Sequence, residues 1–142
     1  MLVGFRAQNV RSFRDEVELS MRATGLAEAA VPRDVDWRRA SGKALRLLPV
    51  AGVFGANASG KTNLVRAMDD LRSFVLGSFR QGVPGRAIPR RPFLFADPDE
   101  TTRLEVDLVL DGVRYEYGFV VDDAAEVVFA VRIIVLVEGR ER

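Results

Sequence analysis

Residues 47–62 read LLPVAGVFGANASGKT, and this stretch decides the fold. Its first half, Leu47 to Phe54, is a nearly continuous apolar run, which is typical of a strand buried on both faces in a parallel sheet. Its second half, residues 55–62, fits the pattern G-x-x-x-x-G-K-[ST], in which a glycine-rich turn leads into a helix. The stretch therefore predicts the strand, phosphate-binding loop and helix of an α/β P-loop domain.

The chemistry of residues 55–62 follows from their backbone. The glycines let the chain curl so that the N–H groups of about Asn57 to Thr62 point into one concavity, and the helix that follows adds its positive end. Lys61 is predicted to reach the β- and γ-phosphates, and the Thr62 hydroxyl to ligate Mg²⁺. The alternative is a glycine-rich turn that binds nothing. The predicted cofactors are ATP and Mg²⁺, and the predicted phosphate-binding residues are Gly55, Ala56, Asn57, Ala58, Ser59, Gly60, Lys61 and Thr62.

The choice of lysine at position 61 supports this interpretation. Of the 21 basic residues, 19 are arginines, and lysine occurs only at Lys43 and Lys61. A compact ammonium on a flexible stem suits a phosphate cradle as a point charge, where a planar guanidinium would not fit.

A helical period follows the loop, from Gly60 to Leu76, and Gly77 gives a stop signal. Two pairs of opposite charge, Arg66–Asp70 and Asp69–Arg72, are spaced to meet on its exposed side. The apolar face of this helix is predicted to contain Leu64, Met68, Leu71 and Val75.

The flanking segments alternate with a period of two. Residues 2–9 and 14–21 predict an antiparallel pair around a turn at Asn9 to Phe13. Residues 104–110 and 113–121 predict a hairpin around Asp111-Gly112, and residues 127–137 a third strand of this meander.

Two segments are predicted as loops or insertions. Residues 22–46 are polar and mixed, and residues 77–96 are rich in glycine and proline. The second segment carries Arg80, Arg86, Arg90 and Arg91 and no acidic residue. A solvated loop and a contact with DNA phosphates both remain open for these arginines.

The composition limits the remaining possibilities. The 142 residues suffice for one domain, and 48% hydrophobic and 29% charged residues are typical of a globular protein. The chain has no cysteine and no histidine, which excludes disulfides and the usual zinc sites. Its longest apolar stretch, residues 127–137, is interrupted by Arg132 and is too short for a membrane span. We expect a cytoplasmic protein without a membrane segment.

The string GANASGKTNLVRAM resembles the Walker A region of ABC-type ATPases of the SMC/RecF/OLD group. The turn Asn9-Val10-Arg11-Ser12-Phe13 resembles the N-F-R-S-F-like turn of that group, with Val10 in place of the usual aromatic residue. The stretch PFLF…RLEVDLVLDGVRYEYGF is similar to the antiparallel strands of AAA-type ATP-binding proteins related to OLD, often found in bacterial anti-phage defence. The resemblance implies an ATPase domain, of which residues 1–142 form the N-terminal part.

The departures from the resembled group concern catalysis. Nothing in the chain matches a signature motif, and no switch histidine is available. Residues 119–123 imitate a Walker B strand, but their place after a hairpin favours a turn carrying Asp122 and Asp123. Gln81 is expected to be solvated rather than part of a Q-loop. The catalytic residues therefore stay unknown, and the resemblance implies completion by a homodimer partner or a second ATPase half.

Two functions are compatible with these observations. The first is binding of ATP·Mg²⁺ by the N-terminal part of an ATPase, with hydrolysis only when missing elements are supplied. The second is a nucleotide-binding or dimerisation module without turnover of its own. A third class, a P-loop kinase or GTPase, is less favoured because no guanine-reading N/T-K-x-D motif is present.

Overall fold

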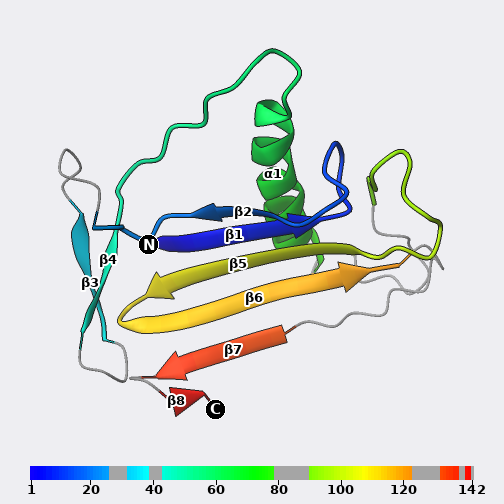
Figure 1. Ribbon diagram of the computed structural model, residues 1–142. Coiled ribbons are helices and arrows are strands. Elements are labelled where there is room, and N and C mark those ends of the chain that lie inside the picture. Colours follow the sequence, from blue (N-terminus) through cyan, green and yellow to red (C-terminus); the bar gives the residue numbers. More distant parts are fainter. Residues whose placement is uncertain (26–31, 39–42, 79–89, 123–131, 138–139, 142) are drawn as a thin grey trace.

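The computed structural model describes residues 1–25, 32–38, 43–78, 90–122, 132–137 and 140–141. An antiparallel sheet of six strands, in the order β2-β1-β5-β6-β7-β8, carries one helix, and a separate pair, β3–β4, lies at one end of it (Figure 1). The fold class is α/β, as predicted. The elements are β1 (Leu2–Gln8), β2 (Val17–Ser20), β3 (Arg33–Arg38), β4 (Ala44–Leu47), α1 (Lys61–Ser78), β5 (Thr102–Leu110), β6 (Val113–Val121), β7 (Arg132–Val137) and β8 (Arg140–Glu141).

The segments with period two form the sheet. β1 and β2 pair antiparallel, and the β5–β6 hairpin pairs along its whole length, from Thr102 opposite Val121 to Leu110 opposite Val113. Asp111 and Gly112 both have positive φ, 49° and 75°, which suits the tight two-residue turn predicted for them. The third strand is confirmed over the residues of β7, while residues 123–131 lie outside the described part of the chain.

The helix α1 packs its apolar face on β1, β5 and β6. Leu64 and Leu71 are buried as predicted and Met68 is half-buried, but Val75 is exposed. The fully buried Ala67 lets the helix lie close to the sheet. The ring of Phe74 lies 4.1 Å from that of Phe119 on β6. The core below the helix consists of Phe5, Ala7, Val10, Leu64, Ala67, Leu71, Leu104, Phe119 and Val121.

Part of the predicted loop 22–46 is a strand pair instead. β3 and β4 pair antiparallel, and Trp37, Leu45 and Leu47 bury against Val3 and Val109 at the end of the large sheet. The polar composition of this segment concealed the strands, because their other residues face solvent. Burial of the one tryptophan is what orders them.

The predicted buried strand at residues 47–54 is wrong for this structure. β4 ends at Leu47, and residues 50–55 follow as an exposed extended connection to α1. The side chains of Val50 and Phe54 are 76% and 94% exposed. A buried strand needs neighbours for its backbone N–H and C=O groups. Among the described residues, every pair of neighbouring strands is antiparallel, and none of these pairs includes residues 48–54. This segment therefore has no strand beside it.

Candidate functional site

The 55–62 loop connects the exposed segment to α1, which begins at Lys61. Two of its residues have left-handed backbone, Ala58 with φ 62° and Gly60 with φ 92°. A Cβ on Gly55 would lie 2.8 Å from Ser59 Oγ. The loop therefore curls tightly on itself. Gly60 occupies a left-handed position where a side chain would be strained, and a side chain at Gly55 would require Ser59 Oγ to shift.

Backbone N–H groups collect at the start of the helix. Ser59 N–H donates to Ala56 O at 3.3 Å, and Leu64 N–H donates to Gly60 O at 3.0 Å. Among the described residues, nothing accepts a hydrogen bond from the N–H groups of Gly60, Lys61 or Thr62. The first N–H groups of a helix have no partner within it, and together they attract an anion.

The Lys61 side chain bends back over the loop. Its Nζ donates to the carbonyl oxygens of Gly55, at 2.7 Å, and Ala56, at 2.5 Å. The ammonium thus lies on the loop rather than in the core. The Thr62 side chain is exposed beside it. The structure brings all eight predicted site residues, 55 to 62, into one loop and helix start.

A turn from the other end of the sequence lies against this loop. A Cβ on Gly60 would be 3.1 Å from Ser12 Oγ and 3.2 Å from two ring atoms of Phe13. Arg11 in the same turn donates two hydrogen bonds to the carboxylate of Asp70 on α1, at 2.7 and 2.8 Å. The predicted partner of Asp70 was Arg66. Asp70 pairs with Arg11 instead, because two hydrogen bonds from one half-buried guanidinium are stronger than an exposed ion pair between residues of the same helix. The other predicted pair, Asp69–Arg72, is present at 3.8 Å.

Asn9 holds this turn in place, and its role was missed from the sequence. The side chain is 1% exposed, and it donates to Glu100 O at 2.8 Å and accepts from Phe93 N–H at 2.9 Å. The backbone carbonyl oxygen of Asn9 accepts a hydrogen bond from the hydroxyl of Thr102 at 2.7 Å. Asn9 has φ 47°, a left-handed conformation that asparagine tolerates better than most residues. An asparagine at the start of a predicted turn was the only signal for this position.

The predicted loop 77–96 uses one of its arginines, Arg90, in hydrogen bonds within the protein. Arg90 donates from Nε to Thr102 Oγ1 at 3.0 Å, and also to Glu100 O. These bonds hold part of the Arg90 side chain within the protein, while Arg91 is exposed. Arg80, Gln81 and Arg86 lie outside the described residues. Residues 94–100 form turns rather than a strand, with Glu100 N–H donating to Asp97 O at 3.0 Å.

Residues 119–121, which resemble the start of a Walker B motif, form the end of β6. Residues 119–121 pair antiparallel with β5, and Asp122 follows directly as a half-buried residue. Asp123 lies outside the described residues. In the described part of the chain, no group of three or more carboxylate, histidine or cysteine side chains is placed to hold a metal ion. No described helix is long and apolar enough to cross a membrane.

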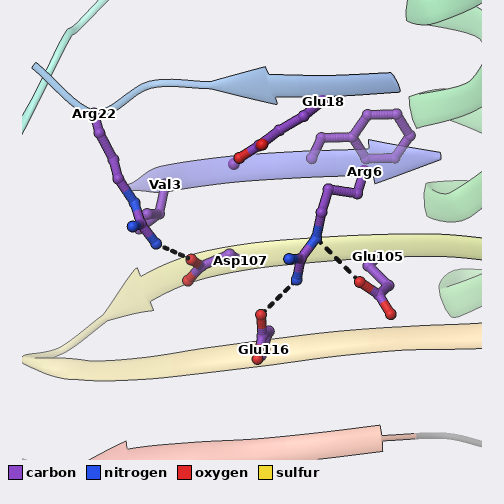
Figure 2. Close-up of a pocket in the computed structure, with 9 residues that line it drawn as sticks. Val3, Arg6, Glu18, Arg22, Glu105, Asp107 and Glu116 are labelled. Atoms are coloured by element: carbon purple, nitrogen blue, oxygen red, sulfur yellow. Dashed lines mark hydrogen bonds and ion pairs between the residues drawn. The ribbon is translucent and has the colours of Figure 1, made fainter. Parts of the chain in front are cut away.

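A small polar pocket, of about 30 Å³, lies on the sheet face opposite the helix (Figure 2). Arg6 lies between Glu105, at 3.1 Å, and Glu116, at 2.6 Å. Asp107 accepts from Arg22 at 3.3 Å and twice from Arg114, at 2.8 and 2.5 Å, and this hydrogen bonding raises the pKa of Arg114 above its usual value. The pocket has room for little more than a water molecule. Ion pairs join the three arginines to Glu105, Asp107 and Glu116, so this cluster is a structural ion-pair network.

Comparison with known proteins concerns the part of the chain around the loop. A family model described as "AAA domain, putative AbiEii toxin, Type IV TA system" matches residues 50–139, more than half of the chain. No curated protein is similar enough to match. The matched segment contains the 55–62 loop, α1 and the β5–β6 hairpin, and nucleotide binding is the property that the match supports. The chain therefore belongs to this AAA-domain family.

Proposed function

We propose that the chain binds ATP·Mg²⁺ through the 55–62 loop, which acts as a Walker A P-loop of an ATPase. The observation that carries the proposal is the position of Lys61, whose ammonium is held over a tight loop at the start of α1. Its present partners are two neutral carbonyl oxygens. A phosphate would compete well for the ammonium, because its negative charge adds the attraction between opposite charges to the hydrogen bond.

The residues fit a nucleotide phosphate chain. The N–H groups of Gly60, Lys61 and Thr62 supply donors at the positive end of a helix of 18 residues. A Cβ at Gly55 would press on Ser59 Oγ, and Gly60 adopts the left-handed backbone that glycine allows just before the helix. Lys61 would hold the phosphates and Thr62 would ligate Mg²⁺, whose charge neutralises the phosphate oxygens when it is bound.

We propose that this chain by itself binds ATP without hydrolysing it. A P-loop holds the phosphates, but transfer to water also needs a group that orients the water. Within the described residues, Asp122 is the acidic residue that a Walker B strand would end on, and the strand before it, β6, pairs antiparallel with its neighbour β5. The competing function, a nucleotide-binding or dimerisation module without turnover, rests on this same observation.

A homodimer partner or second ATPase half is part of the proposal. Several large apolar side chains are exposed near the loop. They are Val50, Val53 and Phe54 before the loop and Val65 and Leu76 on α1. An apolar groove of about 480 Å³ runs beside the helix, lined by Phe5, Met68, Asp69, Leu71, Arg72, Val75, Leu76 and Val106. Exposed apolar surface of this extent supports contact with further polypeptide.

The finer family assignment is also proposed. The Walker A string and the Asn9–Phe13 turn support the SMC/RecF/OLD group, and the family description supports a role in a bacterial toxin–antitoxin or defence system. Such a protein would work in the cytoplasm.

The direct test is a binding titration with ATP, with GTP and Mg²⁺-free buffer as comparisons. We expect saturable binding of ATP that strengthens with Mg²⁺. A chain that binds neither nucleotide would contradict the proposal.

Replacing Thr62 with alanine is expected to weaken binding of ATP in Mg²⁺ more than binding in the presence of a chelator. The hydroxyl is the proposed metal ligand, and its loss leaves the backbone donors unchanged. The matched control is Thr24→Ala, which removes a hydroxyl from an exposed position outside the loop. Equal losses with and without Mg²⁺ would assign Thr62 another role.

The purified chain is expected to bind ATP and to release phosphate at a rate near that of buffer. Steady-state phosphate release should be measured over a concentration series, beside an Asp122→Asn/Asp123→Asn variant. Robust turnover that collapses in this variant would identify a functional Walker B strand. Turnover that survives it and is lost in Lys61→Ala would place the catalytic group elsewhere.

A further inference from the structure

The 9–14 turn touches the 55–62 loop at the residue where loop becomes helix. The α-carbon of Gly60 is so close to Ser12 and Phe13 that an added Cβ would lie 3.1–3.2 Å from their side-chain atoms. Gly60 also has the largest positive φ among the described residues, 92°. The direction of the next N–H groups, those of Lys61 and Thr62, depends on this one backbone position.

A second contact fixes the same turn to the helix. Arg11 and Asp70 form a bidentate pair, with side chains 11% and 27% exposed. Asp70 lies in the third turn of α1, well away from Gly60 along the helix axis. Two separated attachments prevent the helix from tilting or sliding relative to the turn.

The turn itself is held rigidly by the rest of the protein. Asn9 and Arg11 both have positive φ, 47° and 55°, a conformation that persists only where surrounding contacts determine it. Arg11 N–H donates to Arg91 O at 2.8 Å, and Arg14 pairs with Glu100 at 2.8 Å. The turn therefore connects the large sheet to the loop as a firm support.

We propose that Arg11, Ser12 and Phe13 are positioning residues that set the geometry of the phosphate-binding loop. This inference rests on the proposed function. The N–H donors of the loop bind a phosphate chain well only when they are already aligned, and misplacement of about 1 Å weakens such a site. Because coupling is reciprocal, bound nucleotide also stabilises the 9–14 turn.

The test uses variants of two ion pairs. Arg11→Ala and the near-isosteric Asp70→Asn break the pair between turn and helix. Arg114→Ala breaks the pair with Asp107, which is also bidentate and has side chains 15% and 10% exposed, between β6 and β5. For each chain, ATP affinity, the urea midpoint and amide hydrogen exchange of residues 55–64 are measured.

We expect Arg11→Ala and Asp70→Asn to lower ATP affinity by about 2- to 30-fold, the range seen for coupling through packed contacts. Both should also speed exchange in the 55–64 amides without nucleotide. Arg114→Ala should lower the urea midpoint at least as much but leave affinity and loop exchange unchanged.

The outcomes separate the two proposals. If the parent chain binds no ATP, the proposed function fails, and faster loop exchange in Arg11→Ala still supports positioning. If the parent binds ATP but both variants bind it equally well, with unchanged loop exchange, the positioning role is overturned. Equal losses in Arg114→Ala would overturn it too, since the effect would then be general destabilisation.

Discussion

Lys61→Ala is expected to lower the affinity for ATP by about 10- to 100-fold, the value of a hydrogen-bonded charge. The ammonium contacts two loop carbonyls and no core residue, so its removal leaves the packing of α1 unchanged. The urea midpoint of the variant should therefore match that of the parent chain. A titration monitored by calorimetry measures the first quantity, and circular dichroism in urea measures the second.

Lys43→Ala is the matched control, because Lys43 is the other lysine of the chain and is exposed before β4. It removes the same charge and should leave ATP affinity unchanged. Equal weakening in both variants would indicate a general electrostatic effect. An unchanged affinity in Lys61→Ala would show that the 55–62 loop is not the phosphate site.

The second large effect is expected on stability. Asn9→Ala should lower the free energy of unfolding by about 2–4 kcal/mol, because it leaves the part-buried Phe93 N–H without its partner and removes one of the two hydrogen bonds to Glu100 O, the other coming from Arg90. The variant also places alanine at φ 47°, which alanine adopts less readily. Urea unfolding followed by tryptophan fluorescence reports the change, since Trp37 is buried.

Two further variants define the cause. Gln8→Ala removes an exposed amide one residue earlier and should change stability by less than about 0.5 kcal/mol. Asn9→Asp keeps the acceptor for Phe93 N–H but loses the donor to Glu100 O, so it should lie between Gln8→Ala and Asn9→Ala. A small effect of Asn9→Ala would show that water replaces both bonds.

Elements with a strong local pattern were predictable from the sequence. The helix after Gly60, the β1–β2 pair and the β5–β6 hairpin all formed near their expected bounds. Their signals are periodicity and turn chemistry, which act between residues close along the chain. The Asp111-Gly112 turn is the clearest case, since both residues adopt the positive φ that its two-residue length requires. The motif at residues 55–62 also depends only on neighbouring residues, so the position of the candidate site was predictable from the sequence.

Tertiary structure decided the features that depend on distant neighbours. The apolar run 47–54 is strand-like in composition, but a strand needs another strand beside it, and the described part of the chain pairs its strands elsewhere. Asp70 has an available partner four residues away, yet it pairs with Arg11, which lies 59 positions away in sequence. Asn9 is buried because residues 91–100 and 9–14 meet where β1 ends and β5 begins. Sequence alone determined which segments could become helix, hairpin and loop, because those preferences are local. Packing determined which polar groups support the loop, because burial is a property of the assembled chain.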